Sequence, residues 1–328
     1  MPSILFIYKN KNLADQFVKH FKLNGYSIHQ FYDEELPYYK FSKLQQLENI
    51  FYRIFKRDTQ HIHKIEQRNF ISVTNKKLKK LEQKNLKFDF CFVIRGDLIP
   101  ENVIRYARSI SDKMVDYQLD GLSVSKKILD YDYLFDQIYV FDDKDVLDYP
   151  GYNLKSITNC FFEENTNVNK SIDFSYIGVN TENRFNILNN LYDILKDLDK
   201  NYVINFYLKQ DEFHSKFSEK LIMINDSLNY KNCLEISNRT KVLIDLKRQE
   251  HNGLSLRFFE ALNYKNKIIT NNNSVLNYDF YHPDNIYITD YKNYEGLEEF
   301  LSKPYFMIDE NIIIKYRFDN WIKNILYT

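Results

Sequence analysis

The chain has 328 residues, enough for two domains of ordinary size, and its hydrophobic content of 44% suits a protein with a substantial core. Lys plus Arg and Asp plus Glu number 45 each, so net charge argues neither for nor against nucleic acid, and we predict no nucleic-acid partner. Three widely spaced cysteines form no metal motif and no disulfide framework, and no apolar run approaches the length of a membrane span, so we expect a cytoplasmic protein.

The N-terminal part of the chain alternates predicted strands and helices. A buried-type strand at 4–8 is followed by a helix at 13–23 and a second strand at 26–31. Asn24-Gly25 supplies the stop signal for that helix. The chain therefore opens β–α–β, as a Rossmann-like domain does.

The segment 41–87 interrupts this alternation. Between Lys43 and Lys87 there are twelve basic residues and four acidic ones, the one strong charge asymmetry in a neutral chain. Its first part is predicted to be an amphipathic helix, with one face made by Phe41, Leu44, Leu47, Phe51, Ile54 and Phe55. Two interpretations stay open. The basic face is simply solvated, or it contacts an anionic membrane surface or a phosphate-bearing, lipid-linked acceptor.

Two aspartates follow central strands of the first half. The apolar run 88–94 predicts a strand that ends at Arg95-Gly96-Asp97, and Pro100 opens the next helix. Further strands are expected at 113–117, ending near Asp116, and at 138–141. Because ligands bind at the carboxyl ends of such strands, Asp97 is the position expected for an active-site carboxylate. The alternative is a turn aspartate that caps the following helix.

A second β–α series begins after a break. Pro150-Gly151 and the polar stretch 163–170 indicate a linker, which places a domain boundary near 165–172. A helix is expected at 183–198. The predicted strands of this half are 173–177, 203–207, 236–237, 242–246, 268–270 and 286–288.

The corner from His251 to Leu262 carries the strongest chemical signal. It lies between two predicted strands, and its helix is expected to begin near Ser255. Gly253 lets backbone N–H groups approach an anion, and Arg257 can bind a phosphate with its two-pronged guanidinium. Glu260 follows about one turn later and could accept hydrogen bonds from a ribose diol. This arrangement describes a nucleotide-diphosphate pocket, and the alternative is an ordinary β–α corner with a solvated Arg and Glu.

The stretch from Asn252 to Leu262 resembles the nucleotide-sugar motif of GT-B fold glycosyltransferases. It is closest to the Gly-x-Ser/Thr-x-Arg-x-x-Glu pattern of the CgeB-like group and related bacterial capsule and lipopolysaccharide transferases. In the wider retaining GT-B enzymes two Glu residues are separated by seven others. Glu260 matches the second of these, whereas Asn252 stands at the first, so inverting and retaining chemistry both stay open.

Two further stretches extend the resemblance along the chain. The segment from Phe174 to Gly178, followed by Arg184, resembles the opening strand and loop of the C-terminal GT-B domain. The segment from Phe92 to Asp97 resembles a strand end in the N-terminal domain.

The resemblance implies an α/β fold with two Rossmann-like domains facing a cleft. An acceptor domain would span 1–165 with the basic helical insertion 41–87, a donor domain 166–310, and a C-terminal helix 311–328 would return to the first domain. The implied catalytic base is Asp97 or Asp116. The implied nucleotide-sugar contacts are Gly178, Arg184, Lys247, Asn252, Gly253, Ser255, Leu256, Arg257 and Glu260.

The function that follows is metal-independent transfer of a sugar from a nucleotide-activated donor to a hydroxyl of a cell-surface polysaccharide, lipid-linked or protein-linked glycan. No cofactor is expected beyond the donor substrate. GT-A glycosyltransferases hold a divalent metal with an Asp-x-Asp that follows an apolar strand, but Asp130 and Asp132 lie in a stretch predicted to be helical. Two alternatives are a nucleotide-sugar-binding or assembly protein without turnover, and a nucleotide-sugar epimerase on the same fold.

Overall fold

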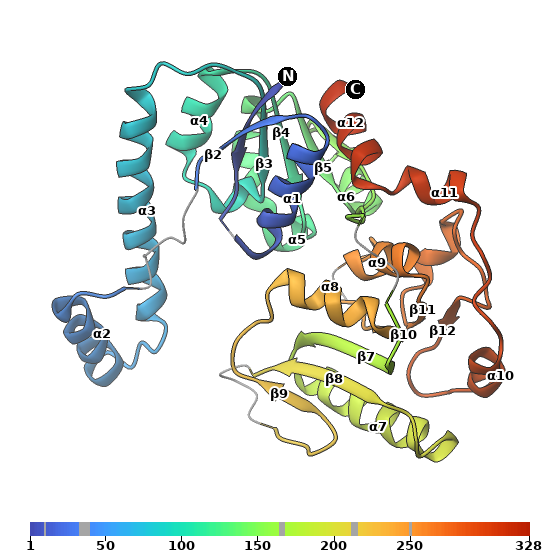
Figure 1. The fold of residues 1–328 in the computed structure, drawn as a ribbon. Helices are drawn as coiled ribbons and strands as arrows, with labels where there is room; N and C mark the ends of the chain where they lie inside the picture. Colours follow the sequence, from blue (N-terminus) through green and yellow to red (C-terminus); the bar gives the residue numbers. More distant parts are fainter. Residues whose placement is uncertain (10, 33–39, 164–167, 211–215, 249–250) are drawn as a thin grey trace. The chain divides into compact units, whose positions relative to one another are not determined.

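Figure 1 shows the computed structural model of the protein, which describes residues 1–328 except 10, 33–39, 164–167, 211–215 and 249–250. Residues 164–167 of the expected linker at 163–170 therefore lie outside the described residues. The chain forms two compact units. The first comprises Met1–Ala14, Phe21–Tyr139 and Tyr149–Lys155, and the second comprises Asp15–His20, Val140–Asp148 and Ser156–Thr328.

The first sheet has six strands in the order β2-β1-β3-β4-β5-β6. Its strands are β1 (Ser3–Ile7), β2 (Ser27–Gln30), β3 (Phe88–Ile94), β4 (Ser111–Gln118), β5 (Gln137–Val140) and β6 (Leu154–Ser156). β1 pairs in parallel with both β2 and β3, and β3 pairs in parallel with β4. Since the chain leaves β1 on one side for β2 and on the other for β3, the carboxyl ends of β1 and β3 form a topological switch point.

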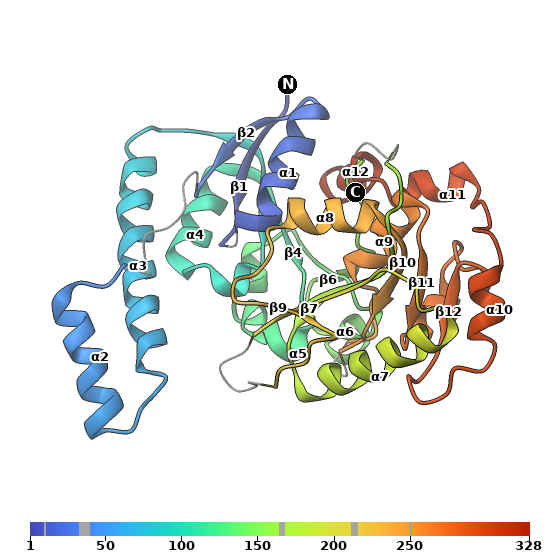
Figure 2. The same cartoon turned by 60° about the horizontal axis from the view of Figure 1, so that its bottom comes forward.

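The helices around the first sheet fall into two groups. One group connects neighbouring strands and comprises α1 (Lys11–Leu23), α4 (Glu101–Ser109), α5 (Leu122–Ser125) and α6 (Asp143–Asp148), with the 3-10 turns η2 (Gly96–Leu98) and η3 (Lys126–Leu134). Residues Asp15–His20 of α1 and all of α6 belong to the second unit. The second group is the insertion between β2 and β3, which consists of α2 (Lys43–Phe55) and α3 (His61–Glu82). Figures 1 and 2 show α3 beside α4, with α2 on the far side of α3.

The second sheet also has six strands, in the order β12-β11-β10-β7-β8-β9, and all its adjacent pairs are parallel. They are β7 (Ile172–Val179), β8 (Ile204–Lys209), β9 (Ile222–Ile224), β10 (Thr240–Asp245), β11 (Lys267–Thr270) and β12 (Ile286–Ile288). Numbered within the unit, this is the order 6-5-4-1-2-3 of a Rossmann fold. The switch point therefore lies between β7 and β10.

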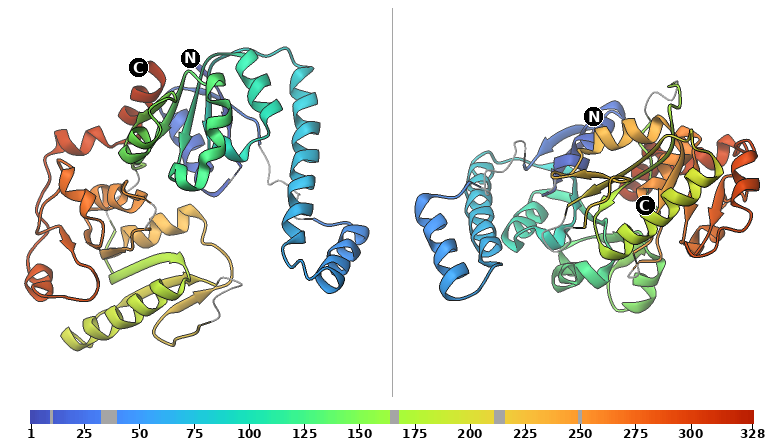
Figure 3. Two further views of the ribbon diagram at one scale, coloured as in Figure 1. Left: turned by 180° about the vertical axis from the view of Figure 1, so that it is seen from behind. Right: turned by 90° about the horizontal axis from the view of Figure 1, so that it is seen from below.

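Helices cover both faces of the second sheet (Figure 3). The helices from β7 onward are α7 (Glu182–Leu198), α8 (Tyr230–Asn238), α9 (Leu256–Tyr264), α10 (Leu297–Ser302), α11 (Glu310–Lys315) and α12 (Phe318–Tyr327), with the 3-10 turn η4 (Asn273–Asn277). The apolar stripe of α7 packs with Phe174 and Phe206, and Phe258 and Phe259 of α9 pack with Ile268. None of the described helices combines the length and the apolar composition that a membrane span requires.

The last helix, α12, packs on residues of α1 that belong to the second unit. The rings of Phe318 and Trp321 lie 5.6 Å and 6.0 Å from the ring of Phe17, measured between centroids. The indole N–H of Trp321 donates to the carbonyl of Thr158 at 2.6 Å. The one tryptophan of the chain thus fixes α12 by both apolar contact and a hydrogen bond.

The two parallel six-stranded sheets confirm the predicted α/β class, and one predicted strand is wrong. Residues 236–237 lie within α8 and form no strand. The sequence shows no apolar helical periodicity here, because the buried side of α8 includes the polar residues Ser237 and Asn238 beside Leu234. The short strands β6 and β9 were not predicted.

Candidate functional site

Asp245, the last residue of β10, binds three side chains at the carboxyl edge of the second sheet. The buried carboxylate accepts hydrogen bonds from Ser255 Oγ at 2.8 Å, Arg257 Nη1 at 3.0 Å and Thr270 Oγ1 at 2.9 Å. It thereby joins β10 to β11 and to the start of α9. Ser255 occupies the predicted N-cap position, but it makes no capping hydrogen bond with its side chain. The N–H of Phe258 donates to the carbonyl of Ser255 at 3.2 Å, and the N–H groups of Leu256 and Arg257 precede the first residue that a regular helix can pair internally.

Arg257 spans the switch point between β7 and β10. Besides Asp245, its guanidinium donates through Nη2 to the carbonyl of Ile177 at 2.9 Å, and it lies over the ring of Tyr176 at 5.4 Å from the centroid. Gly178 makes room for that ring, because a Cβ at this position would lie 2.3 Å from the phenol oxygen of Tyr176. Two of the predicted site residues, Gly178 and Arg257, therefore both lie against the ring of Tyr176.

Positive charge gathers around the same tyrosine. Burial raises the pKa of Tyr176, while the charges of Arg184, Arg257 and Arg248 oppose this rise. Three arginines thus lie within electrostatic reach of one phenol: Arg184 in the first turn of α7, Arg257 in the first turn of α9, and Arg248 after β10. Sequence reasoning missed Arg248, although its position next to Lys247 after a buried strand was a usable signal.

The loop before α9 is held by hydrogen bonds to the backbone and to the side chain of Asn252. Asn252 donates its N–H to Asp142 Oδ2 at 2.6 Å and accepts from Lys247 Nζ through Oδ1 at 2.8 Å. A Cβ at Gly253 would lie 2.3 Å from the carbonyl oxygen of Phe141. The close approach that this glycine permits is therefore to a protein carbonyl. Leu256, the first residue of α9, contributes its N–H to the uncapped helix end.

Glu260 faces α8. Its buried carboxylate accepts hydrogen bonds from Tyr230 Oη at 2.9 Å and from Ser237 Oγ at 3.0 Å. Both partners were unpredicted, because α8 was not recognised. Each carboxylate oxygen can accept more than one hydrogen bond, so these contacts occupy the group without exhausting its capacity.

In the first unit, Asp97 lies just after β3, at that sheet's own switch point. Arg95 has a left-handed backbone with φ of 56° and donates to both oxygens of Asp97, at 2.8 Å and 2.9 Å. The same guanidinium contacts Asp120. Lys9, after β1, is close enough for its pKa to respond to the charges of Asp97 and Arg95, although burial is the main cause of its lowered pKa.

Asp116 lies within β4 and is fully buried. It accepts the backbone N–H of Gly96 at 2.8 Å and Gln118 Nε2 at 2.7 Å. Burial raises the pKa of Asp116 to about 8, with a smaller contribution from the charge of Asp97. The two predicted carboxylates are therefore neighbours, but Asp116 is enclosed by protein whereas Asp97 is bound to an arginine.

Asp130 and Asp132 lie in η3, and Asp132 Oδ2 accepts the N–H of Asn153 at 3.3 Å. Within the described ranges, no three His, Cys, Asp or Glu residues are grouped so that they could hold a metal ion.

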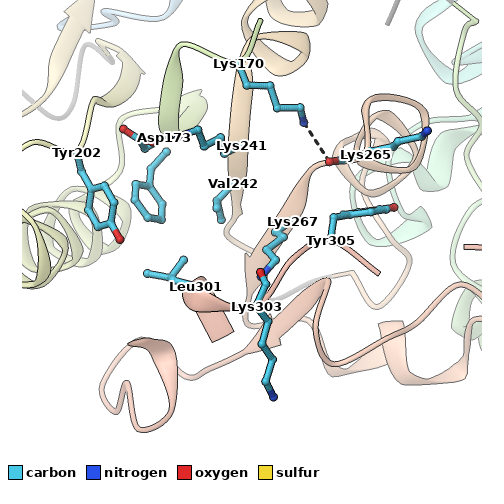
Figure 4. A pocket seen from close by; sticks show the side chains of 11 residues that line it. Lys170, Asp173, Tyr202, Lys241, Val242, Lys265, Lys267, Leu301, Lys303 and Tyr305 are labelled. Atoms are coloured by element: carbon cyan, nitrogen blue, oxygen red, sulfur yellow. Dashed lines mark hydrogen bonds and ion pairs between the residues drawn. The ribbon is translucent and has the colours of Figure 1, made fainter. Parts of the chain in front are cut away.

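A separate cavity of about 330 Å³ lies at the opposite, amino-terminal edge of the second sheet (Figure 4). Lys170 enters it and donates to the carbonyl of Lys265 at 3.0 Å, and burial lowers the pKa of Lys170 to about 8. Its other lining residues include Asp173, Phe174, Tyr202, Lys241, Lys267 and Tyr305. The cavity contains none of the predicted site residues.

Comparison with solved structures identifies the fold. No protein-family model and no curated protein sequence matches the chain. The structure of trehalose-6-phosphate from E. coli bound with UDP-2-fluoro glucose is similar, with a TM-score of 0.56 at 10% identity over 99% of this chain and 98% of that one. An alpha-glucosyltransferase in complex with UDP and DNA gives a TM-score of 0.54 at 12% identity, over 99% and 94% of the two chains. The protein therefore has the fold of the GT-B glycosyltransferases.

Proposed function

We propose that the protein is a glycosyltransferase that uses a nucleotide-activated sugar. The observation that carries this proposal is the position of Arg257, bound to Asp245 and Ile177 at the switch point of a Rossmann-ordered sheet. Ligands of such sheets bind at the carboxyl edge of the strands at the switch point. Both structural relatives described above hold a UDP compound, which supports a nucleoside diphosphate as the leaving group.

The second unit would bind the donor. The diphosphate would interact with Arg257, Arg184 and Lys247, and with the N–H groups of Ser255 and Leu256 at the start of α9. Arg248, which lies next to Lys247, adds a further charge. Fixed cations and N–H groups stabilise a departing diphosphate without reorganisation, so we propose that transfer requires no metal.

The first unit would supply the catalytic base if the reaction inverts. Asp97 is our choice, because it lies at the switch point of the first sheet. Arg95 donates to both of its carboxylate oxygens, and an acceptor hydroxyl would have to replace part of that pairing. The burial of Asp116 supports a different role, which is to hold the N–H of Gly96 and so shape the turn that carries Asp97.

The acceptor is proposed to be a glycan hydroxyl on a cell-surface polysaccharide, a lipid-linked precursor or a protein. The pattern Gly253-x-Ser255-x-Arg257-x-x-Glu260 favours the CgeB-like and capsule or lipopolysaccharide group. We propose a cytoplasmic enzyme, since donors of this kind are used where nucleotides are present.

The test is incubation of the full chain with a panel of nucleotide sugars, with and without candidate glycan acceptors. Release of nucleotide together with a glycosylated acceptor is the result we expect. Conversion of the donor to an isomeric nucleotide sugar would instead identify an epimerase. Saturable binding with no chemical change in the presence of every acceptor would identify a binding protein.

A further inference from the structure

Helix α2 exposes its apolar side. None of its residues is buried. Its six large apolar side chains are between 48% and 79% exposed, and they are Leu44, Leu47, Ile50, Phe51, Ile54 and Phe55. A surface helix ordinarily turns such a stripe toward the core. The orientation of α2 therefore leaves a contiguous apolar surface without a partner in its own unit, among the residues that the structure describes.

The contacts that attach α2 to α3 involve its polar and aromatic residues. Gln45 Nε2 donates to Asn69 Oδ1 at 2.7 Å. Glu48 Oε1 accepts from His61 Nε2 at 2.8 Å and from Arg68 Nη2 at 2.6 Å.

The ring of Tyr52 stacks on the ring of His61 with centroids 3.7 Å apart. At 3.6 residues per turn, Gln45, Glu48 and Tyr52 share one side of the helix, and the apolar residues occupy another. The capping box of Ser42 and Gln45 fixes the start of α2. The sequence thus specifies a stable helix that is attached through its polar side.

Basic residues surround the exposed stripe. Lys43, Arg53, Lys56 and Arg57 lie on α2 or directly after it and are exposed. The acidic residue of α2, Glu48, is engaged by His61 and Arg68. Exposed lysines at 76, 79 and 80 lie farther along α3, beyond the residues of α3 that contact α2. An apolar side flanked by cations is the composition of a helix that lies in the plane of an anionic membrane surface.

We propose that α2 anchors the protein to an anionic lipid bilayer, with its apolar side inserted at the level of the headgroups. A helix of 13 residues is about 20 Å long, too short to cross a bilayer and suitable for lying in its surface. A second copy of the chain is the less suitable occupant, because it would bring the same excess of positive charge to the interface. This inference is independent of the proposed glycosyl transfer.

The test is co-sedimentation of the full chain with vesicles of phosphatidylglycerol and phosphatidylcholine, and with vesicles of phosphatidylcholine alone. The test variant carries Leu47→Gln, Ile54→Gln and Phe55→Gln. The matched control carries Leu147→Gln, Phe217→Gln and Leu276→Gln, which are 77%, 68% and 53% exposed in the second unit. Far-UV circular dichroism and thermal unfolding establish that each variant is folded.

We expect the wild type and the control to bind anionic vesicles equally, and the α2 variant to bind at least tenfold more weakly. A further variant with Lys76, Lys77, Lys79 and Lys80 changed to Gln should lose affinity at low salt only. Equal binding by the α2 variant and the wild type would overturn the proposal. So would absence of vesicle binding combined with a wild-type dimer that the α2 variant abolishes, since the stripe would then bind a second copy.

Discussion

At the scale of single residues, the buried carboxylates of the two units have opposite surroundings. Asp245 accepts three hydrogen bonds, one of them from a charged arginine. Asp116 accepts only neutral donors and lies in a fully buried position. Burial raises the pKa of Asp116, so the fold favours the protonated form of this side chain.

Asp116→Asn should change how stability depends on pH. The pKa of Asp116 is raised to about 8 by burial, so the folded protein holds a proton that the unfolded chain releases. This stabilisation is complete below the ordinary pKa of about 4 and is lost as pH rises to about 8. Urea unfolding from pH 5 to pH 9 should show the wild type losing up to about 1.4 kcal/mol per pH unit relative to the variant. Parallel pH profiles would mean that Asp116 is ionised in the folded state.

The amide of Gln118 bears on the same proton. Within the described part of the chain, Gln118 Oε1 is buried without a hydrogen-bond partner, while Nε2 donates to Asp116. If the amide of Gln118 is reversed, its Oε1 accepts a hydrogen bond from the O–H of a neutral Asp116. An asparagine side chain at position 116 can also form a hydrogen bond with the amide of Gln118, so we expect the variant to fold.

Glu260→Gln should weaken donor binding more than it disturbs folding. The Tyr230 and Ser237 hydroxyls can turn to accept hydrogen bonds from the new amide. Loss of charge-assisted bonds to a ribose costs roughly 1.5–3 kcal/mol, about 10-fold to 150-fold in affinity. Calorimetric titration with the donor nucleotide measures the difference. Unchanged affinity would leave Glu260 only as the residue that ties α8 to α9.

At the scale of elements, helices and strands with a clear apolar pattern were predictable from the sequence, whereas a helix with buried polar residues was not. The run Phe88–Ile94 was predicted with its observed bounds, because a nearly continuous apolar run leaves few alternatives. The single C-terminal helix expected at 311–328 is divided into α11 (Glu310–Lys315) and α12 (Phe318–Tyr327). In α8 the buried positions include Ser237, whose hydroxyl is bound to Glu260, so hydrophobicity gave no helical signal.

The candidate site divides in the same way. The sequence placed Arg257 in the first turn after a loop, which the local pattern determines. Its partners Asp245, Ile177 and Tyr176 come from two different strands, and only the sheet order brings these together. Periodicity likewise predicted an amphipathic α2 but could not indicate which side contacts α3.

Gly178→Ala should disturb the end of β7. The new Cβ would meet the buried ring of Tyr176, on which Arg257 lies, and overpacking of this kind costs about 1–3 kcal/mol of unfolding free energy. Gly151→Ala is the matched control, because a Cβ there meets nothing within 4 Å. Chemical denaturation of both variants measures the effect. If the two lose equal stability, the ring of Tyr176 is not confined as described.

At the scale of the whole molecule, each unit has a six-stranded sheet with a topological switch point, and the side chains at the two switch points differ. The second presents Arg184, Arg248 and Arg257, and the first presents Asp97 paired with Arg95. Cations suit a diphosphate, and a carboxylate suits an acceptor hydroxyl. This division of charge is the basis for assigning donor and acceptor to different units.

We predict that transfer survives a chelator, because the proposed diphosphate site has arginines and a helix end as its positive charges. Turnover is measured as nucleotide released with and without EDTA. Loss of activity in EDTA that magnesium or manganese restores would contradict metal independence and would redirect attention to Asp130 and Asp132.

The most direct test is calorimetric titration of the full chain with UDP, GDP, ADP and dTDP, compared with Arg257→Lys and Arg317→Lys. Lysine keeps the charge at position 257 but loses the two-pronged geometry. Arg317, which is paired with Asp319, provides the same substitution away from the switch point. We predict that the wild type and Arg317→Lys bind one of these nucleotides with equal affinity and that Arg257→Lys binds it at least about tenfold more weakly. Equal binding by all three proteins, or no binding of any nucleotide by the wild type, would contradict a donor site at Arg257.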